Sequence, residues 1–568
     1  MLNLKNGINW KIALFWAVIL LAIFLRVYNF NDWLLAKGDQ VRDGIKISRA
    51  FEGGVGDLPL LGPRAGGTKL HLGPAYYYLL YGSSIISGNV SLPTTAYPNL
   101  IFSLLSIWIF YFFSKEYFNK DQAMVLTGIF SLSYLAIEHA RFPWNPNSTI
   151  FFSLLFAFAL LKVFKSGKEK NIWWAALAGF AYAIGSQLHF TFFVAFPIIT
   201  VIFLTFNYKR ISRSISWKQA GLFFLVIIFF YIPVIVSDVL NNGENLRLFF
   251  SSISSKSSDH SFFKNLQKDF YYFGKYIFRI ITGYFGPNKV LHYAGSFLAV
   301  LGLGVLVALL KKESDENKMS FLLLNLILFF TFFLVYIPLA YSIDKPRFYL
   351  PIFFVPIVFL GLIAGIIVKK TRGNIIAKIS LLLLAVALIS SNIFFVSAWF
   401  SELGKSTRKS VNPKDTLILK TKKDSAWILW EQLTSSANKI KRDCPQKNIY
   451  LSFSKKVAEF EDTLDYALTY NDKNLKLHLF KLGSNAPFDS SACYYYIFRN
   501  GDEAPKDLNA YFNQKEDFSM GSLGILKIEI KNTTVKDDLS EKSGSTAASE
   551  IEDIAGQNEY WKDVFRKK

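Results

Sequence analysis

The sequence predicts an α-helical polytopic membrane protein, with about eleven transmembrane helices and a C-terminal soluble α/β domain. Hydrophobic residues make up 52% of the 568 residues, and they fall in blocks long enough to cross a bilayer. A bilayer core of about 30 Å takes roughly 20 helical residues. Near residue 400 these blocks stop and short strand-like runs begin, so we place the domain boundary there.

Eleven apolar blocks are candidates for the spanning helices. They lie at residues 10–30, 97–114, 122–138, 149–164, 172–188, 190–206, 218–237, 291–310, 319–339, 348–368 and 375–398. A further apolar run at 75–87 is too short to span, so we predict a helix at the outer surface there.

The basic residues between the blocks test this assignment. If the first block runs outward, every connection predicted to be cytoplasmic carries lysine or arginine at the membrane edge, as the positive-inside bias requires. Counting 75–87 as a crossing would reverse every later loop and break that bias. We therefore predict a multi-pass protein of the cell membrane, with a cytoplasmic N-terminus and an extracytoplasmic C-terminal domain. Much of the net charge of +21 follows from this orientation and does not indicate a nucleic-acid partner.

The first outer loop, at about 31–96, is the richest in polar groups. Residues 39–50 have the pattern of an amphipathic helix, with Asp39, Arg42, Asp43 and Lys46 three or four positions apart on one face. Glycines and the side chains of Arg64, Lys69 and His71 follow. A loop that only joined two helices would need none of these groups.

Three other outer segments bring polar residues to the membrane edge. The segment HARFPWNPNST holds Arg141 and Asn145, and its prolines interrupt the helix. The segment IGSQLHFTFF holds Gln187 and His189 at a turn between two spans, and SIDKPRFYLP holds Arg347. The long segment 238–290 is polar and aromatic, and we predict a second surface helix within it.

These residues fit the needs of a polyprenyl-phosphate sugar substrate. Such a substrate needs an apolar groove, cations for its phosphate, and a carboxylate to take the proton from an incoming hydroxyl. We predict Asp39 as the catalytic base and the phosphate ligands as Arg42, Arg64, Lys69 and Arg347. The candidates for other substrate contacts are Asp43, His71, Arg141, Asn145, Gln187 and His189.

Each cation also has a simpler explanation. Long basic side chains reach lipid headgroups readily, so Arg141 and Arg347 can be interfacial anchors. Packing or a local hydrogen bond is an alternative for His71, Gln187 and His189. Asp39 is harder to explain in this way, because a carboxylate gains nothing from anionic lipid and needs a partner or a role. No metal-binding motif or phosphate-binding loop is present in the sequence, so we predict no cofactor and leave a divalent metal open.

The same residues resemble the GT-C glycosyltransferases, in particular the branch of the protein O-mannosyltransferases and the lipid A aminoarabinose transferases. Asp39-Gln40-Val41-Arg42 is similar to the family's loop motif, and LHLGPAYYYLL is similar to its proline-rich helix start. Residues 141–147 and the PRFYLP segment are similar to two further elements, so that the resemblance covers about residues 8–400. It departs at Gly73, where the family has a lysine or histidine before its proline pair, and at Asn145, where the family often has an acid.

The resemblance implies transfer of one sugar from a polyprenyl phosphate to a protein, lipid or glycan acceptor, with inversion at the anomeric carbon. Two other classes stay open at this point. A transporter or flippase for a lipid-linked glycan would need broken helices or inverted repeats, and the sequence has no such repeat. A non-catalytic envelope scaffold would leave Asp39 and Arg42 unexplained.

The region after residue 400 is predicted as an extracytoplasmic α/β domain at 401–531. Its expected strands are LILKTK, NIYLSF, LKLHLF, CYYYIF and GILKIEI, and its expected helices are 424–442 and 456–470. Cys444 and Cys493 fall in this domain and can either form a disulfide or stay as unpaired packing residues. Residues 532–568 are polar and charged, and we predict disorder there.

Overall fold

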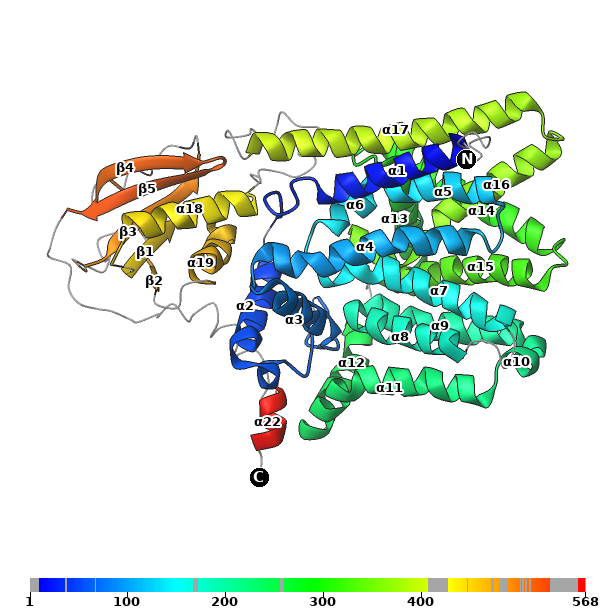
Figure 1. The fold of residues 1–568 in the computed structure, drawn as a ribbon, viewed down its shortest axis with the longest axis horizontal. Helices are drawn as coiled ribbons and strands as arrows, with labels where there is room; N and C mark the ends of the chain where they lie inside the picture. The colour runs from blue at the N-terminus through cyan, green and yellow to red at the C-terminus, as the bar shows by residue number, and fades with distance from the viewer. Residues whose placement is uncertain are drawn as a thin grey trace, which may run out of the picture. The chain divides into compact units, whose positions relative to one another are not determined.

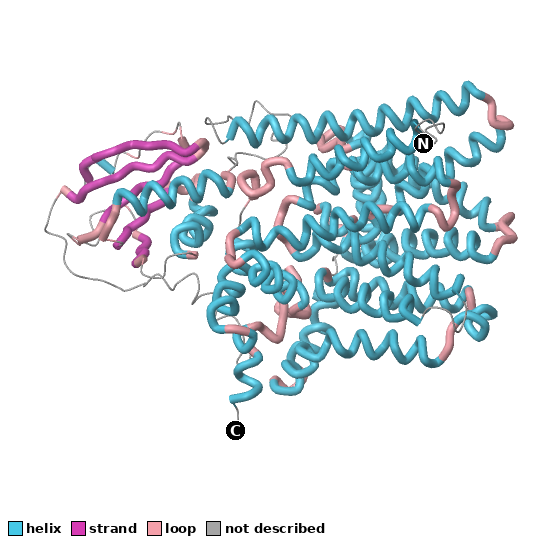
Figure 2. Tube along the Cα trace, viewed as in Figure 1, coloured by secondary structure: helices cyan, strands magenta, loops and turns pink. Residues whose placement is uncertain are grey.

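A computed structural model describes most of the chain. The described residues are 10–35, 38–66, 68–166, 172–255, 260–406, 428–446, 448–470, 475–480, 482, 489, 491–500, 502, 505, 508–509, 512–531 and 560–566. Helices dominate the first four hundred residues, and the five strands that form the sheet all come later in the chain (Figures 1 and 2). The predicted fold class is confirmed. The expected strand LILKTK lies outside the described residues.

Helices are present at each of the eleven predicted spans. They are α1 Trp10–Val27, α4 Leu92–Ser114, α5 Lys120–Leu132 with α6 Tyr134–Ala140, α7 Thr149–Ser166, α8 Ile172–Leu188, α9 Phe190–Phe206, α11 Trp217–Leu240, α14 Lys289–Leu310, α15 Glu316–Tyr336, α16 Val355–Lys370 and α17 Ile375–Ser406. Within the described residues, eight helices are long and apolar enough to cross a membrane, or up to ten if each of two bent pairs is one span. The 17-residue helix α8 is not among these ten. The number of eleven therefore stays a prediction.

The other helices of this region are α2 Gly38–Gly53, α3 Ala75–Ser87, α10 Tyr208–Ser214, α12 Glu244–Ser255 and α13 Phe262–Thr282. The bounds of α3 coincide with the predicted surface helix, and α3 is not one of the candidate spans.

The prediction for 238–290 was incomplete, because α13 buries much of its surface in the bundle. Gly274 of α13 and Gly295 of α14 permit close contact of the two helices, since a Cβ at either position would overlap the other helix. One face of α13 is buried and includes Asp269 and Arg279, so this helix is a packed element and not only a surface cap.

At the break between α5 and α6, side chains form hydrogen bonds with backbone groups that have no partner within a helix. The chain bends by 53° between these two helices, at Ser133. The side chain of Asn392, on α17, accepts a hydrogen bond from the Tyr134 amide at 2.8 Å and donates one to the Ile281 carbonyl at 2.8 Å. The Ser133 hydroxyl donates to the Ile280 carbonyl at 2.8 Å. These side chains replace the missing helical hydrogen bonds, which apolar surroundings cannot supply.

The C-terminal domain is built on a mixed five-stranded sheet of order β2-β1-β3-β5-β4. Its strands are β1 Asn448–Phe453, β2 Lys476–Leu479, β3 Cys493–Arg499, β4 Phe512–Met520 and β5 Leu523–Ile530, and its main helices are α18 Trp430–Asp443 and α19 Glu461–Thr469. β1 is parallel to β2 and to β3, whereas β5 is antiparallel to β3 and to β4.

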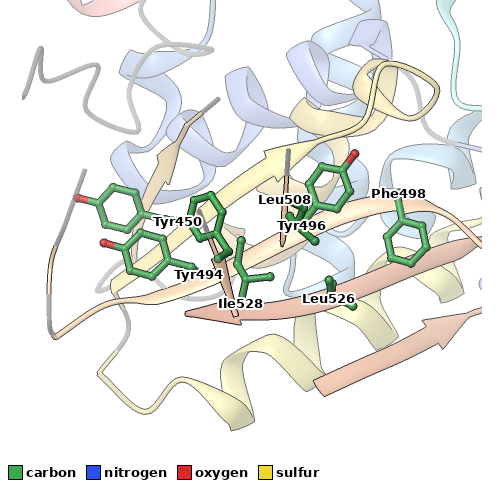
Figure 3. Packing of buried hydrophobic residues seen from close by; sticks show 8 residues of the cluster. Tyr450, Tyr494, Tyr496, Phe498, Leu508, Leu526 and Ile528 are labelled. Atoms are coloured by element: carbon green, nitrogen blue, oxygen red, sulfur yellow. The ribbon is translucent and has the colours of Figure 1, made fainter. Parts of the chain in front are cut away.

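One face of this sheet carries a buried aromatic cluster (Figure 3). Its members on neighbouring strands are Tyr450, Tyr494, Tyr496, Phe498, Leu526 and Ile528. The alternate positions on β3 share a face because side chains of a strand alternate between its two sides. Cys444, at the end of α18, forms a disulfide with Cys493 of β3, with their Cα atoms 5.9 Å apart. The pairing that the sequence left open is therefore present.

The chain divides into two compact units that do not follow the predicted boundary at residue 400. One unit contains residues 1–28, 59–79 and 96–396, and the other contains 29–58, 80–95 and 397–568. The first outer loop is therefore shared between them, and α2 belongs to the unit of the C-terminal domain. The disorder predicted for 532–568 is wrong for one piece, because Trp561–Arg566 form the helix α22.

Candidate functional site

Asp39, Arg42 and Asp43 form one ion-paired group on the first turns of α2. The Arg42 guanidinium donates from Nη1 to Asp39 Oδ1 at 3.0 Å, and from Nε and Nη2 to Asp43 Oδ1 at 2.9 and 2.7 Å. The two carboxylates differ in access, since the Asp39 side chain is 50% exposed and the Asp43 side chain is 3% exposed. Asp43 is therefore the residue that fixes Arg42, while Asp39 stays accessible to a substrate hydroxyl.

Arg64, Lys69 and His71 lie on a short hairpin of the other unit. Backbone hydrogen bonds join Gly62 to Leu72 and Ala65 to Leu70, and they bring Arg64 opposite His71. Lys69 is exposed in the turn between them. A cluster of buried apolar residues holds the hairpin in place, and it comprises Ala65, Leu70 and Leu72 with Phe190, Leu248 and Phe249 against it.

The hydrogen bonds of His71 determine which of its ring nitrogens carries the proton. Nδ1 lies 2.9 Å from the Gly62 carbonyl, which can only accept, so Nδ1 donates. Nε2 then accepts from Arg64 Nε at 3.3 Å, because an arginine nitrogen can only donate. A neutral His71 thus orients Arg64, and a doubly protonated ring would lose this contact.

Asn245 of α12 is a residue that the sequence analysis missed. It accepts a hydrogen bond from the His71 amide at 3.0 Å and donates one to the His71 carbonyl at 3.1 Å. It therefore pairs with the hairpin as a neighbouring strand would. No sequence signal links two positions 174 residues apart, so this role could not be predicted.

Arg347 lies next to the same hairpin. It belongs to the short 3-10 helix Pro346–Phe348, and its guanidinium lies over the Trp144 ring, 5.2 Å from the ring centroid. A Cβ built on Gly66 would be 3.4 Å from its Nη2 atom. His189 is close by, because its ring packs edge-on against Phe348 at 5.4 Å. The structure thus gathers the hairpin, Arg347 and His189 in one unit.

Three residues predicted to contact substrate make hydrogen bonds within the fold. Buried Arg141 donates to the Arg26 carbonyl at 2.9 Å, next to the end of α1, where a cation is favourable. Burial lowers the pKa of Arg141 to about 9, which still leaves the group charged at neutral pH. Asn145 donates to the Leu188 carbonyl at 2.6 Å. These side chains therefore complete the fold, and their contact with substrate stays a prediction.

Gln187 is the third of these residues, and it explains the glycine at position 73. Its side-chain oxygen accepts from the Ala75 amide at 3.1 Å, and its nitrogen donates to the carbonyls of Ala183 and Phe230, both at 3.0 Å. A Cβ at Gly73 would overlap this side chain. A larger residue at position 73, such as the basic residue of the family the sequence resembles, would therefore have to displace the Gln187 side chain.

His189 is held by a short chain of hydroxyls. Its Nδ1 lies 2.7 Å from the Thr191 hydroxyl, which lies 3.2 Å from the Tyr336 hydroxyl. This network fixes the ring, and neither hydroxyl was predicted as part of the site.

A second missed group is the ion pair of Glu138 with Arg279, at 2.6 Å. The Arg279 side chain is 3% exposed, so the pair holds the end of α6 to α13 in a buried position. An acidic residue inside a predicted span was the signal that could have found it. Among the described residues, no group of three or more histidine, cysteine or acidic side chains could hold a metal ion.

Comparison with known proteins agrees with this architecture. The sequence profile of the dolichyl-phosphate-mannose-protein mannosyltransferase family matches residues 71–236. ArnT from Cupriavidus metallidurans bound to undecaprenyl phosphate has a similar structure, with a TM-score of 0.55 and 12% identity over 92% of this chain and 98% of that one. The oligosaccharyltransferase AglB from Archaeoglobus fulgidus, in complex with an inhibitory peptide and a dolichol-phosphate, is also similar. Its TM-score is 0.51, with 13% identity over 86% of this chain and 69% of that one.

The fold is that of the GT-C membrane glycosyltransferases. At 12–13% identity, the structural similarity establishes the fold alone. The roles of individual residues rest on the geometry of this chain. A search of curated proteins gave no match.

The pairing of Gly73 with Gln187 gives a prediction about stability. Gly73→Ala should destabilise the protein in detergent by about 1–3 kcal/mol, because the new methyl displaces the amide and breaks its hydrogen bonds. In a Gln187→Ala background the same change should cost much less, since the side chain it meets is gone. Thermal unfolding of the four proteins measures this coupling. Equal costs in both backgrounds would show that Gln187 does not determine the residue at position 73.

Proposed function

We propose that this GT-C protein transfers a single sugar from a polyprenyl-phosphate donor to an acceptor hydroxyl on the extracytoplasmic face of the membrane. The observation that carries the proposal is the Arg42 ion-paired group, in which one carboxylate is buried and one is exposed. Support also comes from the solved GT-C structures, since the ArnT structure has undecaprenyl phosphate bound and the AglB structure is a complex with a dolichol-phosphate.

In the proposed reaction the acceptor oxygen attacks the anomeric carbon of the donor sugar. Asp39 takes the acceptor proton as that bond forms. The bond from the anomeric carbon to the phosphate oxygen breaks, and its electron pair leaves with the polyprenyl phosphate. A single displacement of this kind inverts the anomeric carbon.

The cations have separate parts in this proposal. Arg42 is held by two carboxylates and donates to the donor phosphate, while Asp43 keeps its guanidinium in place. Arg347, Arg64 and exposed Lys69 keep the role of phosphate ligands that the sequence predicts for them, and within their own unit His71 orients Arg64. Charge-assisted hydrogen bonds of this kind are the strongest that side chains make.

Asp39→Asn should lower turnover by about 10²–10⁴-fold and leave donor binding nearly unchanged. The amide still accepts a hydrogen bond from Arg42, but it is too weakly basic to take a hydroxyl proton. The measurement is transfer of a labelled sugar from a defined polyprenyl phosphate, with donor binding measured separately. If Asp39→Asn keeps more than about a tenth of the turnover while Asp43→Asn loses it, Asp43 is the base and our assignment is wrong.

Arg347→Ala tests a proposed phosphate contact, whereas Asp39→Asn tests the proposed base. It should weaken donor binding by roughly ten- to a hundredfold, the size expected for one lost charge-assisted contact of about 1.5–3 kcal/mol. Unchanged donor affinity would identify Arg347 as an interfacial anchor.

The predicted orientation supports an extracytoplasmic site, and the Cys444–Cys493 disulfide favours the same side because disulfides persist in oxidising compartments. Cysteines placed singly at exposed Lys312, between α14 and α15, and at exposed Asn513, on β4, test this. An impermeant thiol reagent on intact cells should label position 513, and position 312 only after permeabilisation. Labelling of both positions from the same side would exclude the proposed orientation.

A further inference from the structure

The C-terminal part of the chain contacts the helix that carries Asp39 and Arg42, or the residues directly beside it, at three places. The first contact is just before α2, where Leu35 forms an antiparallel bridge with Leu429. The Trp430 amide donates to the Leu34 carbonyl at 2.9 Å, and the Glu431 amide donates to the Asp32 carbonyl at 3.2 Å. The start of α18 thus fixes the chain that enters α2.

The second contact is at the turn that holds Arg42 and Asp43. Gly44 follows directly, and a Cβ there would be 2.7 Å from Cζ of Tyr466, on α19. The Tyr466 ring is buried, and its hydroxyl donates to the Val90 carbonyl. Glycine at 44 therefore lets α2 approach α19 closely at the position next to the ion-paired group.

The third contact is just beyond the end of α2, where the short helix α22 packs against the 3-10 helix η1, Val55–Asp57 (Figure 1). Lys562 forms an ion pair with Asp57, and the Trp561 amide donates to the Leu58 carbonyl at 3.2 Å. The guanidinium of Arg49 lies over the Tyr560 ring, 4.7 Å from its centroid. These contacts join residues separated by about five hundred positions in the sequence.

A helix such as α2 depends on contacts of this kind. It has sixteen residues and several charged groups, and helices of about this length are marginally stable in water without tertiary packing. Three separate contacts at its start, middle and end supply that packing. The last two leave Asp39 uncovered, because they involve Gly44 and the residues from Arg49 onward.

We propose that the C-terminal domain and α22 are positioning elements, which hold α2 so that Asp39 and Arg42 keep one geometry. Tyr466 and Lys562 are the positioning residues of this arrangement, and neither needs to touch the substrate. The catalytic consequence rests on the proposed transferase function, whereas the contact itself and its effect on α2 can be tested without it.

The contact between α22 and the end of α2 can be tested with an engineered disulfide in the full chain. A Cβ at Gly56 would be 3.5 Å from Lys562 Cβ, which is within the range of natural disulfides. Gly56→Cys with Lys562→Cys should cross-link under mild oxidation, detected as a linked peptide by mass spectrometry. Gly38→Cys with Lys562→Cys is the matched control, because Gly38 is at the opposite end of α2, about 20 Å away at 1.5 Å per residue. Absence of the first cross-link, or equal yields from both pairs, would overturn the proposal.

Hydrogen exchange tests whether these contacts order α2. A chain that ends at residue 559, and separately Tyr466→Ala, should raise amide exchange across residues 39–53 by about tenfold or more. Exchange in the core helix α7 should not change, which distinguishes this result from general unfolding. Unchanged exchange in α2 would show that the helix is ordered without the C-terminal domain.

Measurements of turnover test the catalytic role, and the same cross-link serves as a reversible control. Lys562→Ala should lower turnover by about tenfold or more, because small displacements of a catalytic group are costly. The oxidised Gly56→Cys, Lys562→Cys protein should recover turnover and lose it on reduction, with the wild type under the same reductant as reference. If oxidised and reduced protein have the same turnover, the proposed catalytic role of these contacts is wrong. Absence of turnover in the wild type itself would instead contradict the proposed function and leave the cross-link and exchange results to decide the positioning role.

Discussion

The apolar interior of a membrane cannot satisfy a backbone hydrogen-bonding group, and this constraint explains much of the bundle. At three places where the chain departs from a helix, a side chain takes the place of the missing partner. Asn392 does so at the bend between α5 and α6, and Gln187 does so at the start of α3. Arg141 serves the end of α1 in the same way. Several polar residues near the predicted outer edge of the spans therefore complete the fold.

Sorting the polar residues in this way reduces the candidate site to a few groups. Arg42 with its two carboxylates remains in one unit, and Arg64, His71 and Arg347 remain in the other. Asp43 and His71 act through an arginine, since each fixes the guanidinium next to it. The accessible carboxylate in this set is Asp39, which is why the proposed mechanism depends on it.

The sequence was sufficient for features that depend on local order, and it failed for those that depend on distant contacts. Helix α3 was predicted with its observed bounds from the short apolar run that follows Pro74, and Gly88, with a φ of 69°, follows its end. Strand β4 was missed because most of its side chains are polar and exposed, so it lacks the apolar alternation of a buried strand. The roles of Gln187 and Asn245 could not be predicted, since each depends on a partner more than a hundred residues away.

The same limit applies to the choice between the two carboxylates of α2. Helical spacing places Asp39 and Asp43 on one face, but it cannot say that Asp43 is buried while Asp39 is half-exposed. Tyr466 of the C-terminal domain packs against Gly44, the residue that follows Asp43.

The most direct test of the central claim is to follow both halves of the donor in one experiment. The purified protein in liposomes receives a polyprenyl-phosphate sugar with one label on the sugar and another on the lipid, together with an envelope extract as the source of acceptor. Our account predicts that the sugar label leaves the lipid and appears on the acceptor, with polyprenyl phosphate released in equal amount. Movement of both labels across the bilayer on an intact donor would contradict it and would identify a transporter of lipid-linked sugars.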